Sequence, residues 1–182
     1  MAYTKTNWVN DITPANETNM NNIETGIEQA HQDIANLQPN IITAGITADI
    51  TKTTTTSGIC PMELLNSVGS KLTIEGGAIK IGAGVSKVLA NAKVLAKNND
   101  SSSSIIVQAY IKKSSAGVES NVDAGIDIAN SGSNLSLCMT NTLVSVSEGD
   151  TLYLGWWKGN EKSLSIKKGY LTKLTVEVVE QN

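Results

Sequence analysis

Apolar residues recur at two different spacings along the 182-residue chain. Between Thr13 and Leu37 they fall three and four residues apart, whereas from residue 59 onward they alternate with polar residues. The first spacing is typical of a helix with a single apolar stripe, and the second of β-strands that bury one face. The pattern therefore predicts an N-terminal helix followed by a mainly β domain.

The apolar stripe of the predicted helix is narrow. With Met20 at heptad position a, the a and d positions hold Met20, Ile23, Ile27, Ala30, Ile34 and Leu37. Only Ala35 is apolar among the twelve positions between them, and a stripe of two positions in seven is typical of a coiled-coil seam. Because isoleucine at both a and d favours trimers or tetramers, we predict a trimeric coiled-coil stalk over residues 13–38. The alternative is a lone helix docked on the C-terminal domain.

Helix boundaries and the segment after the helix can also be predicted. Thr13 is a suitable N-cap and Pro14 suits the first helical position, while Pro39 disfavours helix at Gln38. Residues 39–58 are rich in threonine and isoleucine, which favour extended chain. We expect this segment to be a linker between the stalk and a head formed by residues 59–182.

The head has eight to ten predicted strands separated by frequent turn signals and no helical pattern, as in an antiparallel β-sandwich or jelly roll. Gly76-Gly77 lies between two short strand patterns and predicts a tight hairpin. In the stretch 105–111, residues 105, 107, 109 and 111 are expected to face the core. In the stretch 122–128, Ile126 and Ile128 are expected inside, with Asp123 and Asp127 outside.

Charge and composition narrow the functional classes. The net charge is −3, with 14 Lys and Arg residues and no basic cluster, which argues against nucleic-acid binding. No apolar run is long enough for a transmembrane helix, and the N-terminus lacks the apolar region of a signal peptide. Cys60 and Cys138 lie in apolar, strand-like stretches, and we expect both to be buried free thiols.

The sequence offers little for catalysis, and we predict no enzyme activity, metal site or cofactor. His31 is the single histidine and falls on the polar side of the helix, so triads and histidine-based zinc sites are excluded. Asp123 and Asp127 would lie about 13 Å apart on one strand face, which is beyond the carboxylate spacing of glycosidases.

Aromatic residues are the candidates for binding. Alternation with Leu152 and Leu154 places Trp156 in the core, so Trp157 and Tyr153 are expected to face outward. There they suit a subunit interface, packing under a loop, or a ligand such as a sugar. In the N-terminal segment 1–12, the apolar side chains of Tyr3, Trp8, Val9 and Ile12 suit an anchor to a larger assembly, because Trp and Tyr are preferred at binding hot spots. The alternative for Trp8 is packing against the neighbouring helices.

Two stretches resemble known families. Trp8-Val9-Asn10, Thr13-Pro14, Asn19 to Asn22 and Ile23-Glu24-Thr25-Gly26-Ile27 resemble the start of fibre, spike and baseplate proteins of tailed bacteriophages. The C-terminal run VSVSEGDTLYLGWW, followed by the strand YLTKLTVEVVE, resembles the last strands of C1q/TNF-like trimeric jelly-roll heads. The first resemblance implies a virion component attached by its N-terminus, and the second a trimeric β head.

The expected function is therefore that of a virion structural protein. It would be a homotrimeric fibre made in the host cytoplasm, attached to other virion proteins of the capsid or baseplate, with the head reaching a host surface or glycan. The small size favours a head fibre on the capsid. The alternatives are a tail or baseplate receptor-binding protein and a free lectin-like trimer.

Overall fold

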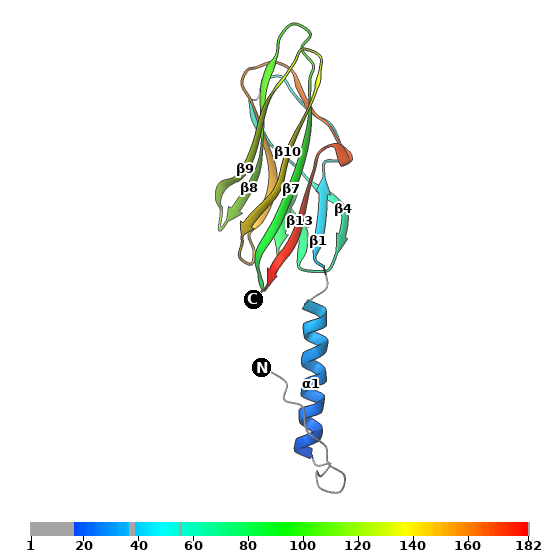
Figure 1. Ribbon diagram of the computed structural model, residues 1–182. Helices are drawn as coiled ribbons and strands as arrows, with labels where there is room; N and C mark the ends of the chain where they lie inside the picture. The colour runs from blue at the N-terminus through cyan, green and yellow to red at the C-terminus, as the bar shows by residue number, and fades with distance from the viewer. Residues whose placement is uncertain (1–16, 37–38, 55, 182) are drawn as a thin grey trace. The chain divides into compact units, whose positions relative to one another are not determined.

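The computed structural model describes residues 17–36, 39–54 and 56–181, which belong to two compact units with a boundary after residue 38 (Figure 1). The first unit contains helix α1 (Glu17–Asn36). The second, from Pro39 onward, is a β head. The predicted helix start at Thr13 and Pro14 lies outside the described residues, as does Leu37.

The head is a sandwich of two antiparallel sheets. The first sheet contains β1 (Ile41–Gly45), β2 (Ile50–Lys52), β4 (Glu63–Val68), β7 (Val85–Asn98), β10 (Asn134–Ser145), β12 (Leu164–Ile166) and β13 (Lys173–Gln181). The second contains β3 (Ser57–Cys60), β5 (Leu72–Glu75), β6 (Ala78–Ile81), β8 (Ile105–Ser115), β9 (Val118–Ala129) and β11 (Thr151–Lys158). A short 3₁₀ helix, η1 (Gly169–Leu171), precedes β13.

Strand β7 is the centre of the first sheet. It pairs with β10 on one edge, while its other edge pairs with β13 along most of its length and with β12 at its end (Figure 1). Its side chains alternate between buried Val88, Ala90, Ala92, Val94 and Ala96 and half-buried positions between them. The small or β-branched side chains at every second position from Val88 to Ala96 give this 14-residue strand a single core face, while the half-buried positions include both leucine and lysine.

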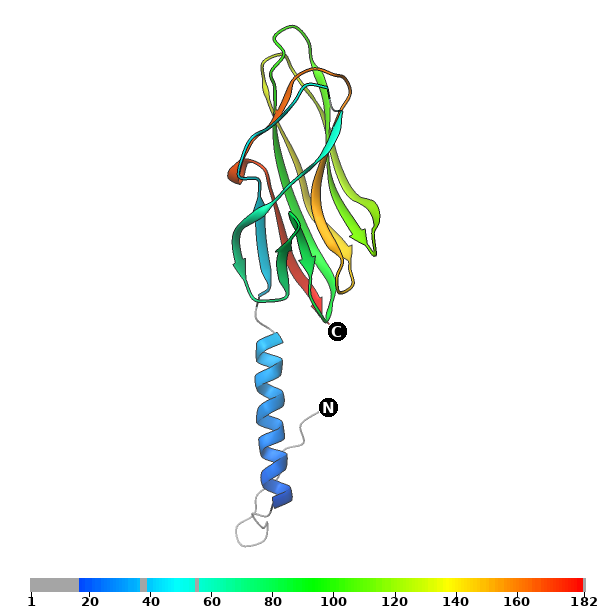
Figure 2. The same cartoon turned by 180° about the vertical axis from the view of Figure 1, so that it is seen from behind.

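In the second sheet, β11 lies between β8 and the shorter strands β3 and β6 (Figure 2). Leu152, Leu154 and Trp156 of β11 point into the core together with Ile105, Val107, Ala109 and Ile111 of β8. The predicted hairpin joins β5 to β6, and Gly76 and Gly77 have φ angles of 57° and 80°. Such a two-residue turn with two positive φ angles strongly favours glycine.

The segment 39–58 is not a linker but part of the sandwich. It supplies β1, β2 and the start of β3, and Ile42 and Ile46 are each 1% exposed in the core. Strand β1 lies between β13 and β4 and buries Ile42 and Ala44 on its core face, while Ile41 and Thr43 on the other face are half-buried. The head therefore begins at Pro39 instead of residue 59.

Strand β9 has the opposite orientation to the one expected. Ile126 and Ile128 pair with Gln108 and Ile106 on the outer face and are 62% and 54% exposed. Asp123 instead faces β10, where the Thr142 hydroxyl donates to its carboxylate at 2.5 Å. The direction is reversed from Asp123 onward because of a register shift: Lys112 pairs with Asn121 and Ile111 with Asp123, so the extra residue Val122 also packs against the core. A one-residue shift moves every following side chain to the other face, and Thr142 satisfies the inward Asp123.

The two cysteines differ in environment, which also corrects an expectation. Cys60 is fully buried, and burial raises the pKa of its thiol to about 12. Cys138 is exposed, because it lies on the outer face of β10 between the buried Leu137 and Met139. No described helix is both long and apolar enough to cross a membrane.

At the end of the head opposite Asn40, hydrogen bonds of polar side chains connect the loops. Asp100 accepts hydrogen bonds from the backbone N–H groups of Ser102 and Ser103 at 2.8 and 3.1 Å, and its other oxygen pairs with Lys162 at 3.3 Å. Asn98, which is buried, donates to the carbonyl oxygens of Ser103 and Ala129. These bonds connect the loop after β7 with β9 and with the loop after β11.

Candidate interaction surfaces

The apolar stripe of α1 is uncovered within the described part of the chain. Met20, Ile27 and Ile34 are 50%, 53% and 56% exposed and follow one another at intervals of seven residues. At the d positions, Ala30 is exposed and Ile23 is half-buried. A repeated, exposed set of large apolar side chains on one helix face is typical of an interaction surface.

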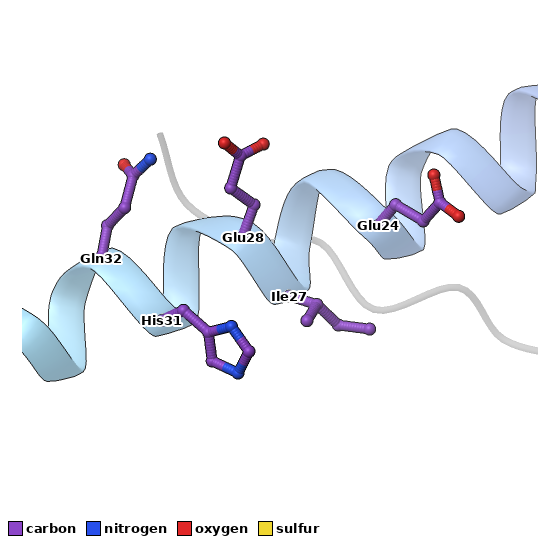
Figure 3. Close-up of a pocket in the computed structure, with 5 residues that line it drawn as sticks. All are labelled: Glu24, Ile27, Glu28, His31 and Gln32. Atoms are coloured by element: carbon purple, nitrogen blue, oxygen red, sulfur yellow. The ribbon is translucent and has the colours of Figure 1, made fainter.

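A hollow of about 530 Å³ lies along the helix beside this stripe. Its described lining residues are Glu24, Ile27, Glu28, His31 and Gln32. Figure 3 shows Ile27 and His31 projecting from one side of the helix and Glu28 and Gln32 from the other, with Glu24 between them. The hollow therefore follows the border between the apolar stripe and a polar face with two carboxylates, and His31 is an exposed member of that border.

A second hollow, of about 300 Å³, lies on the outer face of the second sheet. We call it the Gly155 depression, because Gly155 has no side chain at the outward position between Tyr110 of β8 and Ile59 of β3. Its lining residues among those described are Ser57, Gly58, Ile59, Tyr110, Lys112, Asn121, Trp156 and Trp157. Trp157 and Tyr110 are both half-buried, so each ring presents part of its surface to the depression.

Polar groups of defined geometry surround the depression. The Tyr110 hydroxyl donates to Gln108 Oε1 at 2.7 Å. The Lys112 ammonium pairs with the Glu119 carboxylate at 3.3 Å. The Tyr153 hydroxyl and the Lys112 ammonium lower the pKa of Glu119, because both stabilise the charged form of this carboxylate.

Tyr153 and Trp157, the two candidates from the sequence, have different environments. Tyr153 lies on the outward side of β11 opposite Lys112, yet it is only 4% exposed. Burial and the nearby Glu119 carboxylate raise the pKa of its phenol, whose oxygen has no hydrogen bond of normal geometry among the described residues. Trp157 lines the depression with Tyr110, which sequence reasoning had not selected because β8 and β11 are far apart in the chain.

Trp156 enters the core as predicted and is 2% exposed. Gly58, its partner on β3, makes this possible, since a Cβ at Gly58 would lie 2.9 Å from the indole ring. Four exposed isoleucines lie on the outer face of the second sheet, as the depression does: Ile59, Ile106, Ile126 and Ile128.

The remaining candidates have no further structural assignment. Tyr3, Trp8, Val9 and Ile12 lie outside the described residues. In the described ranges 17–36, 39–54 and 56–181, no group of three or more His, Cys, Asp and Glu side chains is arranged to hold a metal ion.

No protein-family model matches the sequence, and a comparison with curated protein sequences finds no match. Solved structures do resemble the head. The crystal structure of murine APRIL at pH 5.0 has a TM-score of 0.61 and 10% identity, and the match covers 78% of this chain and 99% of APRIL. Eiger TNF from S. frugiperda has a TM-score of 0.59 and 6% identity, covering 79% of this chain and 93% of the other.

These likenesses at low sequence identity define the fold. The head is a mainly β, antiparallel sandwich of the jelly-roll type found in TNF-like proteins. The expected similarity to C1q/TNF-like heads is thus confirmed at the level of fold.

Proposed function

We propose that this protein is a short trimeric fibre of a bacteriophage particle. Three copies associate through the apolar stripe of α1, the N-terminal segment attaches to the virion, and the TNF-like heads face outward. The observation that carries the proposal is the uncovered stripe of Met20, Ile27 and Ile34, repeated every seven residues immediately before a compact β head.

A second and third copy of α1 would explain why such a helix is stable. A single 20-residue helix with glycine at position 26 is marginal in water, and packing usually supplies the missing stability. Identical stripes on neighbouring copies bury one another, and isoleucine at the a and d positions favours three copies over two. The polar flank with Glu24, Glu28 and Gln32 stays in solvent.

The attachment role is supported by the resemblance of residues 3–27 to phage fibre and baseplate proteins. Tyr3, Trp8, Val9 and Ile12 would bind another virion protein through their apolar side chains. The small size supports a head fibre on the capsid, where the protein would be found on the virion surface after synthesis in the host cytoplasm. A tail or baseplate receptor-binding protein is the alternative placement.

The head would bind the host surface or its glycans and not nucleic acid, consistent with the net charge of −3. The Gly155 depression, with its aromatic walls on the outer face of the second sheet, suits binding better than catalysis, so we propose no enzyme activity. The alternative from a different functional class is a free lectin-like trimer, which would not need Trp8 for attachment.

Particle binding and sedimentation together test this function. The full chain and a truncated chain beginning at Pro39 are mixed with particles that lack the protein, and both are also sedimented alone. The truncation begins at Pro39 because Asn40 is buried and accepts hydrogen bonds from Ser70, Lys71 and Val178. We expect a trimer that binds for the full chain and loss of binding for the truncated chain.

Other outcomes would change the assignment. A full chain that sediments as a monomer at micromolar concentration contradicts the stalk. Binding by the truncated chain makes the head itself the attachment device and the protein a capsid decoration protein. The variant Trp8→Ala distinguishes a virion fibre from a free lectin-like trimer, and Trp8→Phe is its control because it keeps an aromatic ring. Normal incorporation of Trp8→Ala into particles would contradict the role of Trp8 as an anchor to the virion.

A further inference from the structure

We infer that the Gly155 depression binds one hexose unit of a neutral glycan. The inference deepens the proposed function, on which it rests for the outward orientation of the head. It identifies the part of the head that binds, the residues that do so and the class of ligand.

The shape of the depression suits one sugar ring. Gly155 leaves the outward position between Tyr110 and Ile59 without a side chain. The Lys112 chain covers that position, because Lys112 Cδ and Cε would lie 3.3 Å from a Cβ at Gly155, and Lys112 is the residue that lines the depression there. Trp157 and Tyr110 are half-buried, which fixes the rings while leaving part of each accessible. The volume of about 300 Å³ is at the lower end of the range for small-molecule sites. A sugar ring has an apolar C–H face that packs on such aromatic surfaces, while its edge carries hydroxyl groups.

The polar groups around the depression match hydroxyl groups better than charged ones. A hydroxyl both donates and accepts a hydrogen bond. Asn121 and Ser57 also combine donors and acceptors, and the Lys112–Glu119 pair at 3.3 Å places a donor next to an acceptor. Hydroxyls on adjacent ring carbons can therefore be satisfied by adjacent protein groups without any net charge in the ligand.

The same pair disfavours an acidic sugar. Lys112 is the one cation among the described lining residues, and its charge is already balanced by Glu119. A carboxylate on the ligand would compete with Glu119 for Lys112 and be repelled by it. The arrangement therefore selects neutral hexoses over sialic or uronic acids.

A protein partner is the competing occupant. Ile106 of β8 and Ile126 and Ile128 of β9 are exposed on the outer face of the second sheet and would suit a flat apolar contact with a protein. None of the three lines the depression, although the exposed Ile59 does. The other lining side chains are Tyr110, Trp156 and Trp157 and the polar Ser57, Lys112 and Asn121. The glycan is therefore favoured for the depression itself, and a protein contact becomes an outcome of the test.

The test measures binding of methyl glycosides to the full-length protein by saturation-transfer NMR and calorimetry. The probes are the methyl glycosides of glucose, galactose and N-acetylglucosamine, with that of N-acetylneuraminic acid as the acidic comparison. Trp157→Ala removes one aromatic wall. Gly155→Val pushes the lining Lys112 chain into the depression while keeping every aromatic ring. The atoms nearest to a Cβ at Gly155 are Cδ and Cε of the flexible Lys112 chain at 3.3 Å, which can shift, and the backbone oxygen of Gly58 at 3.6 Å, so the variant is expected to fold.

Tyr170→Ala is the matched control, because Tyr170 is 66% exposed and is not among the lining residues of the depression. We expect at least one neutral glycoside to bind, and both Trp157→Ala and Gly155→Val to weaken that binding about tenfold or more, as for a hot-spot aromatic. Tyr170→Ala should bind like the wild type.

Three results would overturn the inference: no binding by any neutral glycoside, stronger binding of the acidic one, or unchanged binding in folded Gly155→Val protein. If no glycoside binds but Ile126→Asp prevents adhesion of the protein to host cells, the outer face of the second sheet contacts a protein instead. Sedimentation of the same samples separates the two proposals. If the protein is a trimer but binds no sugar, only the inference about the depression is wrong. If it is a monomer that binds sugar, only the proposed trimeric fibre is wrong.

Discussion

The ammonium nitrogen of Lys158 lies 2.8 Å from the carbonyl oxygen of Thr53 and donates a hydrogen bond to it, although the Lys158 side chain is completely buried. Two more carbonyl oxygens, of Lys52 and Lys162, accept from the same nitrogen. Burial lowers the pKa of Lys158, and the charge of Glu161 opposes this effect. Because three oxygens accept from the ammonium form, Lys158 acts as a cross-link between the loop after β2 and the loop after β11.

Replacing Lys158 with methionine should destabilise the head. The change leaves three carbonyl oxygens without their buried donor, which costs about 1–3 kcal/mol of unfolding free energy. Chemical denaturation of the two proteins measures the difference. Lys52→Met, at an exposed position of β2, is the control and should stay within about 0.5 kcal/mol of the wild type. Equal stability of both variants would contradict the cross-link.

Asp100 should make the head sensitive to acid. Hydrogen bonds from the Ser102 hydroxyl and backbone N–H, together with the nearby Lys162, lower the pKa of Asp100. Since the pKa is lower in the folded state, the stabilisation is present above the unfolded pKa of about 3.9 and is lost as the pH falls further. Melting temperatures between pH 7 and pH 2 should therefore fall more steeply for the wild type than for Asp100→Asn.

Ser102→Ala is an independent check, because it removes one of the donors to Asp100. It should have part of the effect of Asp100→Asn, whereas Ser101→Ala should have none. If the wild type and Asp100→Asn lose stability in parallel across this pH range, the assigned role of Asp100 is wrong.

Charges in the helix stripe should separate the copies. Ile27→Asp with Ile34→Asp puts several like charges into the seam, where they cannot be paired, and should convert the trimer to monomers in sedimentation. Thr25→Asp with Gln32→Asp is the matched control, with the same two charges and the same seven-residue spacing on exposed positions outside the stripe. Similar dissociation of both double variants would mean that net charge, and not the seam, controls assembly.

Gly58 should not tolerate a side chain. The Cβ of Gly58→Ala would lie 2.9 Å from Trp156, so the indole ring or β3 must move, at a cost of about 1–3 kcal/mol. Denaturation and tryptophan fluorescence report both effects. Gly125→Ala is the control, because its Cβ would make an ordinary contact of 3.6 Å with Leu137. A Gly58→Ala protein as stable as Gly125→Ala would contradict the packing of Trp156.

The outward orientation of Ile126 can be tested through stability. Ile126→Thr removes apolar surface that is already 62% exposed and should change the unfolding free energy by less than about 0.5 kcal/mol. Ile111→Thr, on the core face of β8, should cost several times more, about 2 kcal/mol or above. A larger loss of unfolding free energy for Ile126→Thr than for Ile111→Thr would mean that Ile126 faces the core, as the sequence pattern predicts.

Local patterns predicted those parts of the molecule in which each residue's neighbours in sequence determine its environment. The helix, the Gly76-Gly77 hairpin, the core face of residues 105–111 and the position of Trp156 all follow from spacing or turn chemistry. The jelly-roll class followed from the number of short strands, and the likeness to APRIL and Eiger confirms it.

The errors concern pairings between distant segments. Residues 39–58 looked like a linker because they are rich in threonine, and only the pairing of β1 with β13 and of β2 with β12 makes them part of the sandwich. Which side of β9 faces inward depends on a register shift in its pairing with β8, and Thr142 of β10 then satisfies the inward Asp123. The Gly155 depression joins residues from β3, β8, β9 and β11, and no local pattern could show that they meet.

The anchoring of Asn40 has a mechanical consequence. Its backbone oxygen accepts from Val178 N–H at 2.9 Å, and its side-chain oxygen accepts from the N–H groups of Ser70 and Lys71 at 3.1 Å. Strand β1 then continues between β13 and β4, antiparallel to both. Any force on the chain before Pro39 therefore enters the head through Asn40 and β1, which are held by hydrogen bonds to strands on both sides.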